Sequence, residues 1–184
     1  MQNLNMFLDE LQIYAKDNNI PIISKNTQKF LKKLLEKKKP NVCLEVWTAI
    51  WFSTIFQASI IQKRWWFLCW FEISSDAYQK ATNNIIKSRL NNLIIYNTDF
   101  LRFSLKKIHK KIDFVFIDAM KMDYVRYLQK ILQFQNSNIS ILLDNVYKYD
   151  YKMYSLYEFV KKNQLNYKLF KLSEHDWVML ITIK

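Results

Sequence analysis

The chain has 184 residues, 51% of them hydrophobic, and its 28 Lys and Arg against 16 Asp and Glu give a formal net charge of +12. This length and composition fit one globular domain that is large enough for a three-layer core. No apolar run approaches the ~20 residues that span a bilayer, and the polar, acidic start lacks a leader pattern, so we expect a soluble cytoplasmic protein that does not enter membranes.

Apolar residues recur at helical spacing over 4–14 and again over 30–35, which predicts two helices before the first strand. Apolar runs then alternate with amphipathic stretches. The predicted strands are 42–46, 67–73, 93–97, 112–117, 139–143, 167–172 and 178–183. The predicted helices are 54–61, 75–88, 124–134 and 154–162.

Continuous apolar strands separated by helices indicate a parallel sheet covered on both faces, and right-handed crossovers make it doubly wound. The last two predicted strands have no helix between them, so we expect them to pair as an antiparallel hairpin. The fold class is therefore α/β, with a seven-stranded, mostly parallel sheet. We expect a single domain over 1–184, in which two N-terminal helices (1–39) precede the α/β core (40–184).

The chain contains no glycine, although average usage predicts roughly a dozen in this length. It contains six tryptophans, and every one lies at or beside the end of an apolar, strand-like run. At such points the chain turns, and Gly normally supplies the positive φ or the close backbone approach. The six are Trp47, Trp51, Trp65, Trp66, Trp70 and Trp177.

When Trp is replaced by Gly, residues 44–54 become LEVGTAIGFST. This string resembles the first motif of class I S-adenosylmethionine (SAM) dependent methyltransferases, in the form of the metal-dependent O-methyltransferases related to the caffeoyl-CoA enzymes. Residues 64–72 and 176–180 fit the same family under the same replacement. We hypothesise that a stop codon reassigned to Gly was read as Trp. A deliberate Gly-to-Trp replacement would look the same, and six ordinary core tryptophans are the third interpretation.

Polar residues follow the apolar runs at the points where ligands bind in sheets of this kind. As single positions, they are also explained as strand-end caps or turn residues. The six are Glu45, Glu72, Asp99, Asp118, Asp144 and Asn145.

Glu72 ends the second strand and is placed to accept hydrogen bonds from ribose hydroxyls. The loop that carries Trp47, Thr48 and Ser53 would pass under the methionine part of SAM, with Ser53 offering its hydroxyl and amide to the carboxylate. Glu45 would hold this loop or reach the amino end of SAM.

The resemblance further implies that Asp99 contacts adenine. We also expect Asp118 to contact the bound SAM.

Asp118, Asp144 and Asn145 supply two carboxylates and an amide oxygen from adjacent strand ends, a set that suits Mg²⁺ or another divalent cation. In the resembled family the matching residues ligate a divalent ion, and the residue matching Lys121 assists deprotonation of the substrate. Lys121 and Asp118 are therefore the candidate catalytic residues. A plain surface lysine is the alternative for Lys121.

A metal of this kind prefers a substrate with two neighbouring oxygens, such as a catechol or 5-hydroxyuridine. Residues 13–16 and 19–24 resemble the bacterial branch of the family that methylates 5-hydroxyuridine in tRNA, and the positive charge agrees with that partner. The short segment 146–150 implies that the substrate-insertion loop of the plant enzymes is absent. The resemblance also implies a homodimer. A small phenolic substrate, and a basic RNA-binding relative without activity, remain the alternatives.

The basic segments 29–39 and 106–111 also fit solvated helix faces. Cys43 and Cys69 lie in predicted strands without CxxC spacing, so we expect free core thiols and no zinc site.

Overall fold

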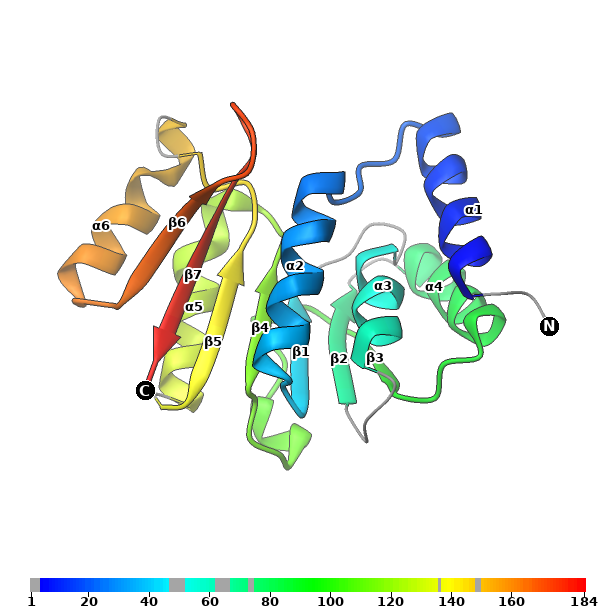
Figure 1. Cartoon of the computed structure of the whole chain (residues 1–184). Helices are drawn as coiled ribbons and strands as arrows, with labels where there is room; N and C mark the ends of the chain where they lie inside the picture. The colour runs from blue at the N-terminus through cyan, green and yellow to red at the C-terminus, as the bar shows by residue number, and fades with distance from the viewer. Residues whose placement is uncertain (1–3, 47–51, 62–66, 73–74, 136, 148–149) are drawn as a thin grey trace.

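The computed structural model describes residues 4–46, 52–61, 75–135, 137–147 and 150–184, and the backbone of 67–72. A single seven-stranded sheet carries helices on both faces (Figure 1). The strand order is β3-β2-β1-β4-β5-β7-β6, in which β7 pairs antiparallel with both β5 and β6 and the other neighbouring strands pair parallel. The strands are β1 (Val42–Val46), β2 (Phe67–Glu72), β3 (Leu93–Asn97), β4 (Phe114–Ile117), β5 (Ile139–Leu143), β6 (Tyr167–Lys171) and β7 (Trp177–Ile183). The predicted fold class and the C-terminal hairpin are confirmed.

Two helices precede β1, and the other helices follow the strands as predicted. The helices are α1 (Leu4–Asp17), α2 (Lys25–Lys38), α3 (Phe52–Ile61), α4 (Ser75–Ser88), α5 (Tyr124–Phe134) and α6 (Tyr154–Lys162). The short 3₁₀ helices in the described residues are η1 (Leu105–Ile108), η2 (Lys121–Asp123) and η3 (Tyr151–Met153). No helix in the described part of the chain is long and apolar enough to cross a membrane.

Four predicted boundaries in the described residues were wrong, and two of them, the end of β6 and the start of β7, differ by only one residue. The strand predicted to start at residue 112 starts at Phe114, because the Asp113 carboxylate accepts the amide protons of Asn41 (2.8 Å) and Val42 (2.9 Å) at the start of β1. The helix predicted to start at residue 54 starts at Phe52, whose ring is 1% exposed and stacks on Phe56 with 6.0 Å between ring centroids.

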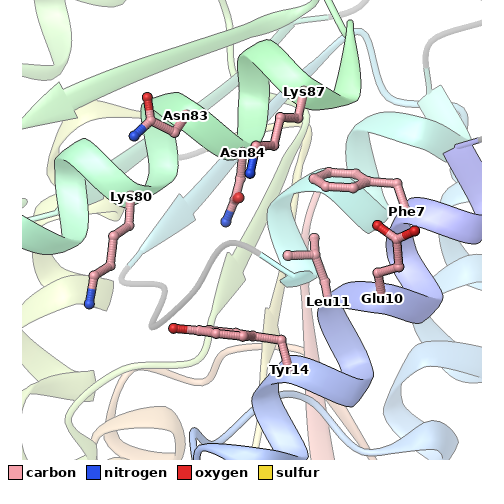
Figure 2. A pocket seen from close by; sticks show the side chains of 8 residues that line it. All are labelled: Phe7, Glu10, Leu11, Tyr14, Lys80, Asn83, Asn84 and Lys87. Atoms are coloured by element: carbon pink, nitrogen blue, oxygen red, sulfur yellow. The ribbon is translucent and has the colours of Figure 1, made fainter. Parts of the chain in front are cut away.

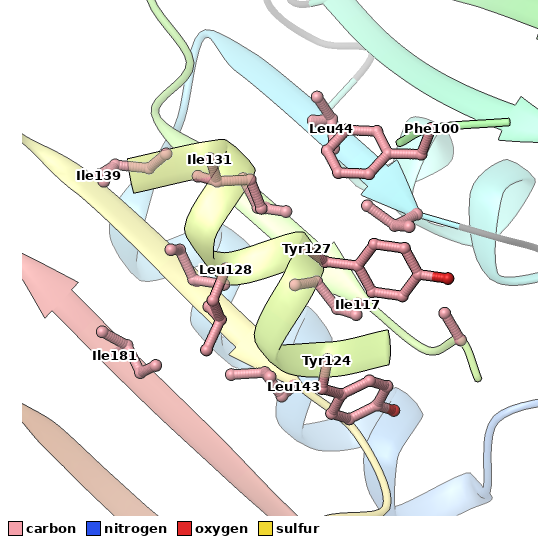
Figure 3. Close-up of a cluster of buried hydrophobic side chains, with 14 of the residues drawn as sticks. Leu44, Phe100, Ile117, Tyr124, Tyr127, Leu128, Ile131, Ile139, Leu143 and Ile181 are labelled. Atoms are coloured by element: carbon pink, nitrogen blue, oxygen red, sulfur yellow. The ribbon is translucent and has the colours of Figure 1, made fainter. Parts of the chain in front are cut away.

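The central strands β1, β4 and β5 are buried on both faces, and alternate residues of each strand point to opposite sides. Val42, Leu44 and Val46 of β1 pack into the cluster that contains α5 and α6, whereas Cys43 packs into the cluster that contains α1, α2 and α3. Figure 3 shows the first cluster, in which α5 lays its apolar face across the strands. Glu45 shares the parity of Cys43, so its side chain enters the core on the α3 side.

The side chain of Cys43 is fully buried in the core, as predicted. The side chain of Cys69 lies outside the described residues. The lysines of 29–39 are exposed along α2, which confirms a solvated helix face. In 106–111, by contrast, only the short η1 is helical.

Candidate active site at the carboxyl edge of the sheet

The carboxyl ends of β4 and β5 bring Asp118 and Asp144 together. The two strands are parallel, with Ile117 opposite Leu143, and the Asp144 amide donates to the Ile117 carbonyl at 2.9 Å. Asp118 and Asp144 therefore leave the sheet side by side, in the region where open α/β sheets bind ligands. Lys121, which opens η2, follows Asp118 closely enough to interact with its charge.

The carboxylates of Asp118 and Asp144 repel each other in a largely buried site. Asp144 is only 2% exposed, and burial raises its pKa, with a further rise from the charge of Asp118. Burial also raises the pKa of Asp118, which the Lys121 ammonium partly lowers again. Desolvation and like charge both disfavour two ionised carboxylates, so a bound cation would be stabilised here.

A third carboxylate, that of Asp176, lies beside this pair and was not predicted. It raises the pKa of both Asp118 and Asp144. The buried hydroxyl of Thr27 lies 3.2 Å from Asp176 Oδ1 and 3.4 Å from Asp144 Oδ1, and the Ser24 hydroxyl also donates to Asp176. Ser24 is the N-cap of α2 and accepts the Thr27 amide proton at 3.0 Å.

The start of α2 is thereby tied to the carboxyl edge of β5. Thr27 and Asp176 are separated by 149 residues, so no local pattern in the sequence could have paired them.

Hydrogen bonds between side chains and the backbone hold the turn at Asp144 and Asn145. Asn145 has a φ of 53°, and its amide donates to Asp144 Oδ1 at 2.9 Å. Tyr124, which is fully buried, donates its hydroxyl proton to the Asp144 carbonyl at 2.9 Å. This turn places Asn145 directly after Asp144 at the carboxyl edge of β5.

The predicted metal set therefore contains two carboxylates and one amide. Within the described ranges, no three His, Cys, Asp or Glu side chains form a group that could hold a metal ion. The donor chemistry of Asp118, Asp144 and Asn145 fits a hard divalent cation that keeps water or substrate oxygens as its other ligands.

Glu45 is fully buried against the first turn of α3. Thr54 Oγ1 donates to Glu45 Oε2 at 2.5 Å, and burial raises the Glu45 pKa to about 8. In the described part of the chain, Glu45 Oε1 and both side-chain polar atoms of Gln57 are buried without a hydrogen-bond partner. Glu45 thus joins β1 to α3, which agrees with a role in holding the segment between them.

Asp99 lies in the turn after β3, next to a cavity of ≈ 350 Å³ that Asn97, Thr98 and Arg102 help to line. Its Oδ1 accepts the Leu101 amide proton at 2.8 Å, so one carboxylate oxygen stabilises the turn. Arg102 is the ion-pair partner of the other oxygen, at 3.9 Å.

The remaining predicted residues are only partly described. Ser53 is half-buried in the first turn of α3. Glu72 lies at the end of β2, as predicted, and pairs with Asn97. The side chain of Glu72 lies outside the described residues, and so do the whole of Trp47 and Thr48. Trp70 and Trp177, whose backbones are described, do not have positive φ, so neither position requires Gly for that reason.

The sheet order and the edge where the acidic residues meet define a class I methyltransferase fold. The family model described as O-methyltransferase matches residues 2–169, and the chain belongs to this family. The prediction of a SAM-dependent O-methyltransferase is therefore confirmed at the level of the family.

Solved structures of methyltransferases share the fold. An O-methyltransferase from Bacillus cereus in complex with SAH is 22% identical, with a TM-score of 0.80, and the match covers 97% of this chain and 91% of that one. An SAH-bound methyltransferase from Podospora anserina is 16% identical (TM-score 0.81; 100% and 88% covered). An O-methyltransferase of tomaymycin synthesis from Streptomyces achromogenes, in complex with SAM, is also 16% identical (TM-score 0.76; 97% and 89% covered).

Proposed function

We propose that this chain transfers the methyl group of SAM to a hydroxyl that has a neighbouring oxygen, that the transfer depends on a divalent cation, and that the substrate is 5-hydroxyuridine in tRNA. The observation that carries the proposal is the meeting of Asp118 and Asp144 at the ends of β4 and β5, with Lys121 and Asn145 beside them. Family membership supports the type of reaction, and the charge of +12 supports a polyanionic substrate.

The chain offers one set of residues for each bound group. Asp118, Asp144 and Asn145 would hold the cation. Glu72, Ser53 and Asp99 would hold the ribose, methionine and adenine parts of SAM, respectively, along the ends of β2, β1 and β3. When bound, a divalent cation lowers the pKa of a coordinated hydroxyl, and SAM supplies a methyl group on a good leaving group.

The side chains contribute position and proton transfer. Asp118 and Asp144 would position the acceptor hydroxyl through the cation that they hold. The Lys121 ammonium, on the side of η2, would assist loss of the hydroxyl proton to water by stabilising the oxyanion that remains. Tyr124 and Thr27 keep Asp144 in place through its carbonyl and carboxylate. Alignment of the acceptor oxygen with the methyl carbon supplies much of the rate enhancement in such a site.

A small catechol-like phenol satisfies the same requirement for two neighbouring oxygens and is the second candidate substrate. The third candidate is a basic RNA-binding relative without activity. It gains support if all six tryptophans are present in the working protein, because Trp47 and Trp51 would then fill the loop that is predicted to bind the cofactor.

Methyl transfer from radiolabelled SAM tests the proposal. We expect label to enter tRNA that contains 5-hydroxyuridine, and we expect Asp144→Asn or removal of divalent cations with EDTA to lower the rate by two orders of magnitude or more. Label that enters a catechol but not the tRNA would select the small-molecule alternative. Transfer that is insensitive to EDTA would contradict metal dependence.

A further inference from the structure

A cavity of ≈ 400 Å³ lies between α1 and α4, apart from the carboxylates of the candidate active site (Figure 2). Four residues of each helix line it, and in both helices they follow the i, i+3, i+4, i+7 spacing of a single helix face. From α1 they are Phe7, Glu10, Leu11 and Tyr14, and from α4 they are Lys80, Asn83, Asn84 and Lys87. The two helices therefore turn these faces toward each other.

The two faces differ in chemistry. On α1, Phe7 (5% exposed) and Leu11 (6% exposed) form an apolar floor, and the ring of Tyr14 is 48% exposed. Glu10 adds one carboxylate to this face, so with the two lysines of α4 the lining keeps a net positive charge. The α4 face is entirely polar and carries two cations and two amides. In Figure 2 the Tyr14 ring and the Lys80 side chain reach into the same space from opposite helices.

A flat aromatic surface, amide groups and ammonium groups are together the features that bind an unpaired nucleotide. The ring of Tyr14 can stack on a base, the side chains of Asn83 and Asn84 can donate to and accept from base edges, and the lysines can contact phosphates. Lys80 and Lys87 are about 10 Å apart along the helix axis, so they would reach different phosphates of one strand. The cavity volume is in the range of ordinary ligand pockets.

We propose that this cavity, the α1–α4 pocket, binds an unpaired nucleotide of the RNA substrate, with the base on Tyr14 and the flanking phosphates on Lys80 and Lys87. The proposal rests on the RNA substrate of the proposed function and assigns part of its binding site. At this pocket a second copy of the chain is a poorer occupant than a polyanion, because Lys80 and Lys87 would face a surface of net positive charge, whereas a dimer through another face would not bring these lysines together.

Fluorescence anisotropy of a labelled single-stranded RNA of about 12 nucleotides tests the pocket directly. The pocket variants are the double variant Lys80→Gln/Lys87→Gln and the single variant Tyr14→Leu. The matched controls are Lys29→Gln/Lys33→Gln, which removes the same charge from the exposed face of α2, and Tyr154→Leu, which removes a 71% exposed Tyr of α6. Circular dichroism and light scattering establish that each variant is folded and show its oligomeric state.

We expect each pocket variant to weaken RNA binding about tenfold or more, while each control changes it less than about threefold. For the lysine pair, the slope of log Kd against log salt should also fall by about 1.4, the value for two lost phosphate contacts with a single strand. Equal losses in pocket and control variants would show diffuse attraction by surface charge and overturn the proposal. A changed oligomeric state in the pocket variants would assign the pocket to a second copy instead, and absence of RNA binding at low salt would also overturn the proposal.

Methyl transfer to tRNA, measured separately with the unaltered chain, keeps the two proposals apart. Transfer to tRNA together with RNA binding that is unchanged in the pocket variants would refute the pocket alone. RNA binding through the pocket without methyl transfer would refute the proposed reaction alone.

Discussion

Without glycine, the chain uses other residues wherever the backbone is left-handed. Seven of the described residues have a φ between 50° and 57°, among them Lys39, His109 and Asn145. Left-handed backbone costs a residue with a Cβ atom roughly 1–2 kcal/mol, and Asn tolerates it best. Asn138, just before β5, is one of these residues, with a φ of 52°.

Lys39→Gly should therefore stabilise the protein. Lys39 ends α2 with a φ of 50° and donates its amide proton to the Leu35 carbonyl at 2.8 Å, a bond that Gly preserves. We expect the free energy of unfolding in urea to rise by about 1 kcal/mol. Lys33→Gly, in the exposed middle of the same helix, is the control and should lower it by about 1 kcal/mol. A loss of stability in Lys39→Gly would show that the left-handed cap is not strained.

Glu45→Gln should stabilise the protein at alkaline pH. Burial raises the Glu45 pKa from 4.5 to about 8, so its ionisation disfavours the folded state. The unfavourable contribution is absent below about pH 4.5 and complete above about pH 8. The variant should match the parent in urea unfolding at about pH 4 and exceed it by roughly a few kcal/mol at about pH 9. A pH-independent difference would argue against a buried, titrating carboxyl group.

At the scale of elements, the N-terminus of α2 supports the candidate active site through Thr27. The Thr27 hydroxyl lies between the carboxylates of Asp144, which follows β5, and Asp176, which precedes β7, and is within hydrogen-bond distance of both. Partners of this kind commonly change metal affinity when they are removed.

Thr27→Val, which keeps the shape but removes the hydroxyl, should weaken binding of Mn²⁺ as a probe about 10- to 100-fold. Electron paramagnetic resonance counts free Mn²⁺ and does not require turnover. Thr82→Val is the matched control, because among the described residues the Thr82 hydroxyl donates to the Tyr78 carbonyl of the same helix, at 2.9 Å. Equal Mn²⁺ affinity in both variants would show that Thr27 does not position Asp144.

Most elements could be predicted because each has a local cause. The alternation of apolar runs and amphipathic stretches gave the bounds of β1, β3, β5, α4, α5 and α6 as observed. The start of β4 could not be predicted, because it depends on the Asp113 side chain capping a strand 71 residues earlier. Asp118 and Asp144 were found because each directly follows an apolar strand in the sequence. Asp176 and Thr27 were missed because only contacts between distant segments bring them to the site.

At the scale of the whole molecule, the sheet gathers acidic residues at one edge while the surface carries net positive charge. This separation suits an enzyme that binds a polyanion over much of its surface and reacts at one acidic site. The predicted homodimer stays a prediction, and light scattering would measure it.

The coding DNA tests the hypothesis about the six tryptophans. We expect the codon at all six positions to be a stop codon that the source organism reads as Gly. Ordinary Trp codons at these positions would contradict it. Trp177 is the most favourable site for a genuine Trp, because its indole donates to the Glu174 carbonyl at 3.1 Å and contacts Tyr147 edge-on.

Calorimetric titration with SAM tests the central claim most directly. Two chains are compared, one with the sequence as written and one with Gly at the six Trp positions. The account predicts that the Gly chain binds one SAM per chain and that Glu72→Ala in this chain weakens binding at least about tenfold, through loss of the ribose contact. If neither chain binds SAM although both are folded, the assignment of the carboxyl edge as a SAM-dependent active site is contradicted.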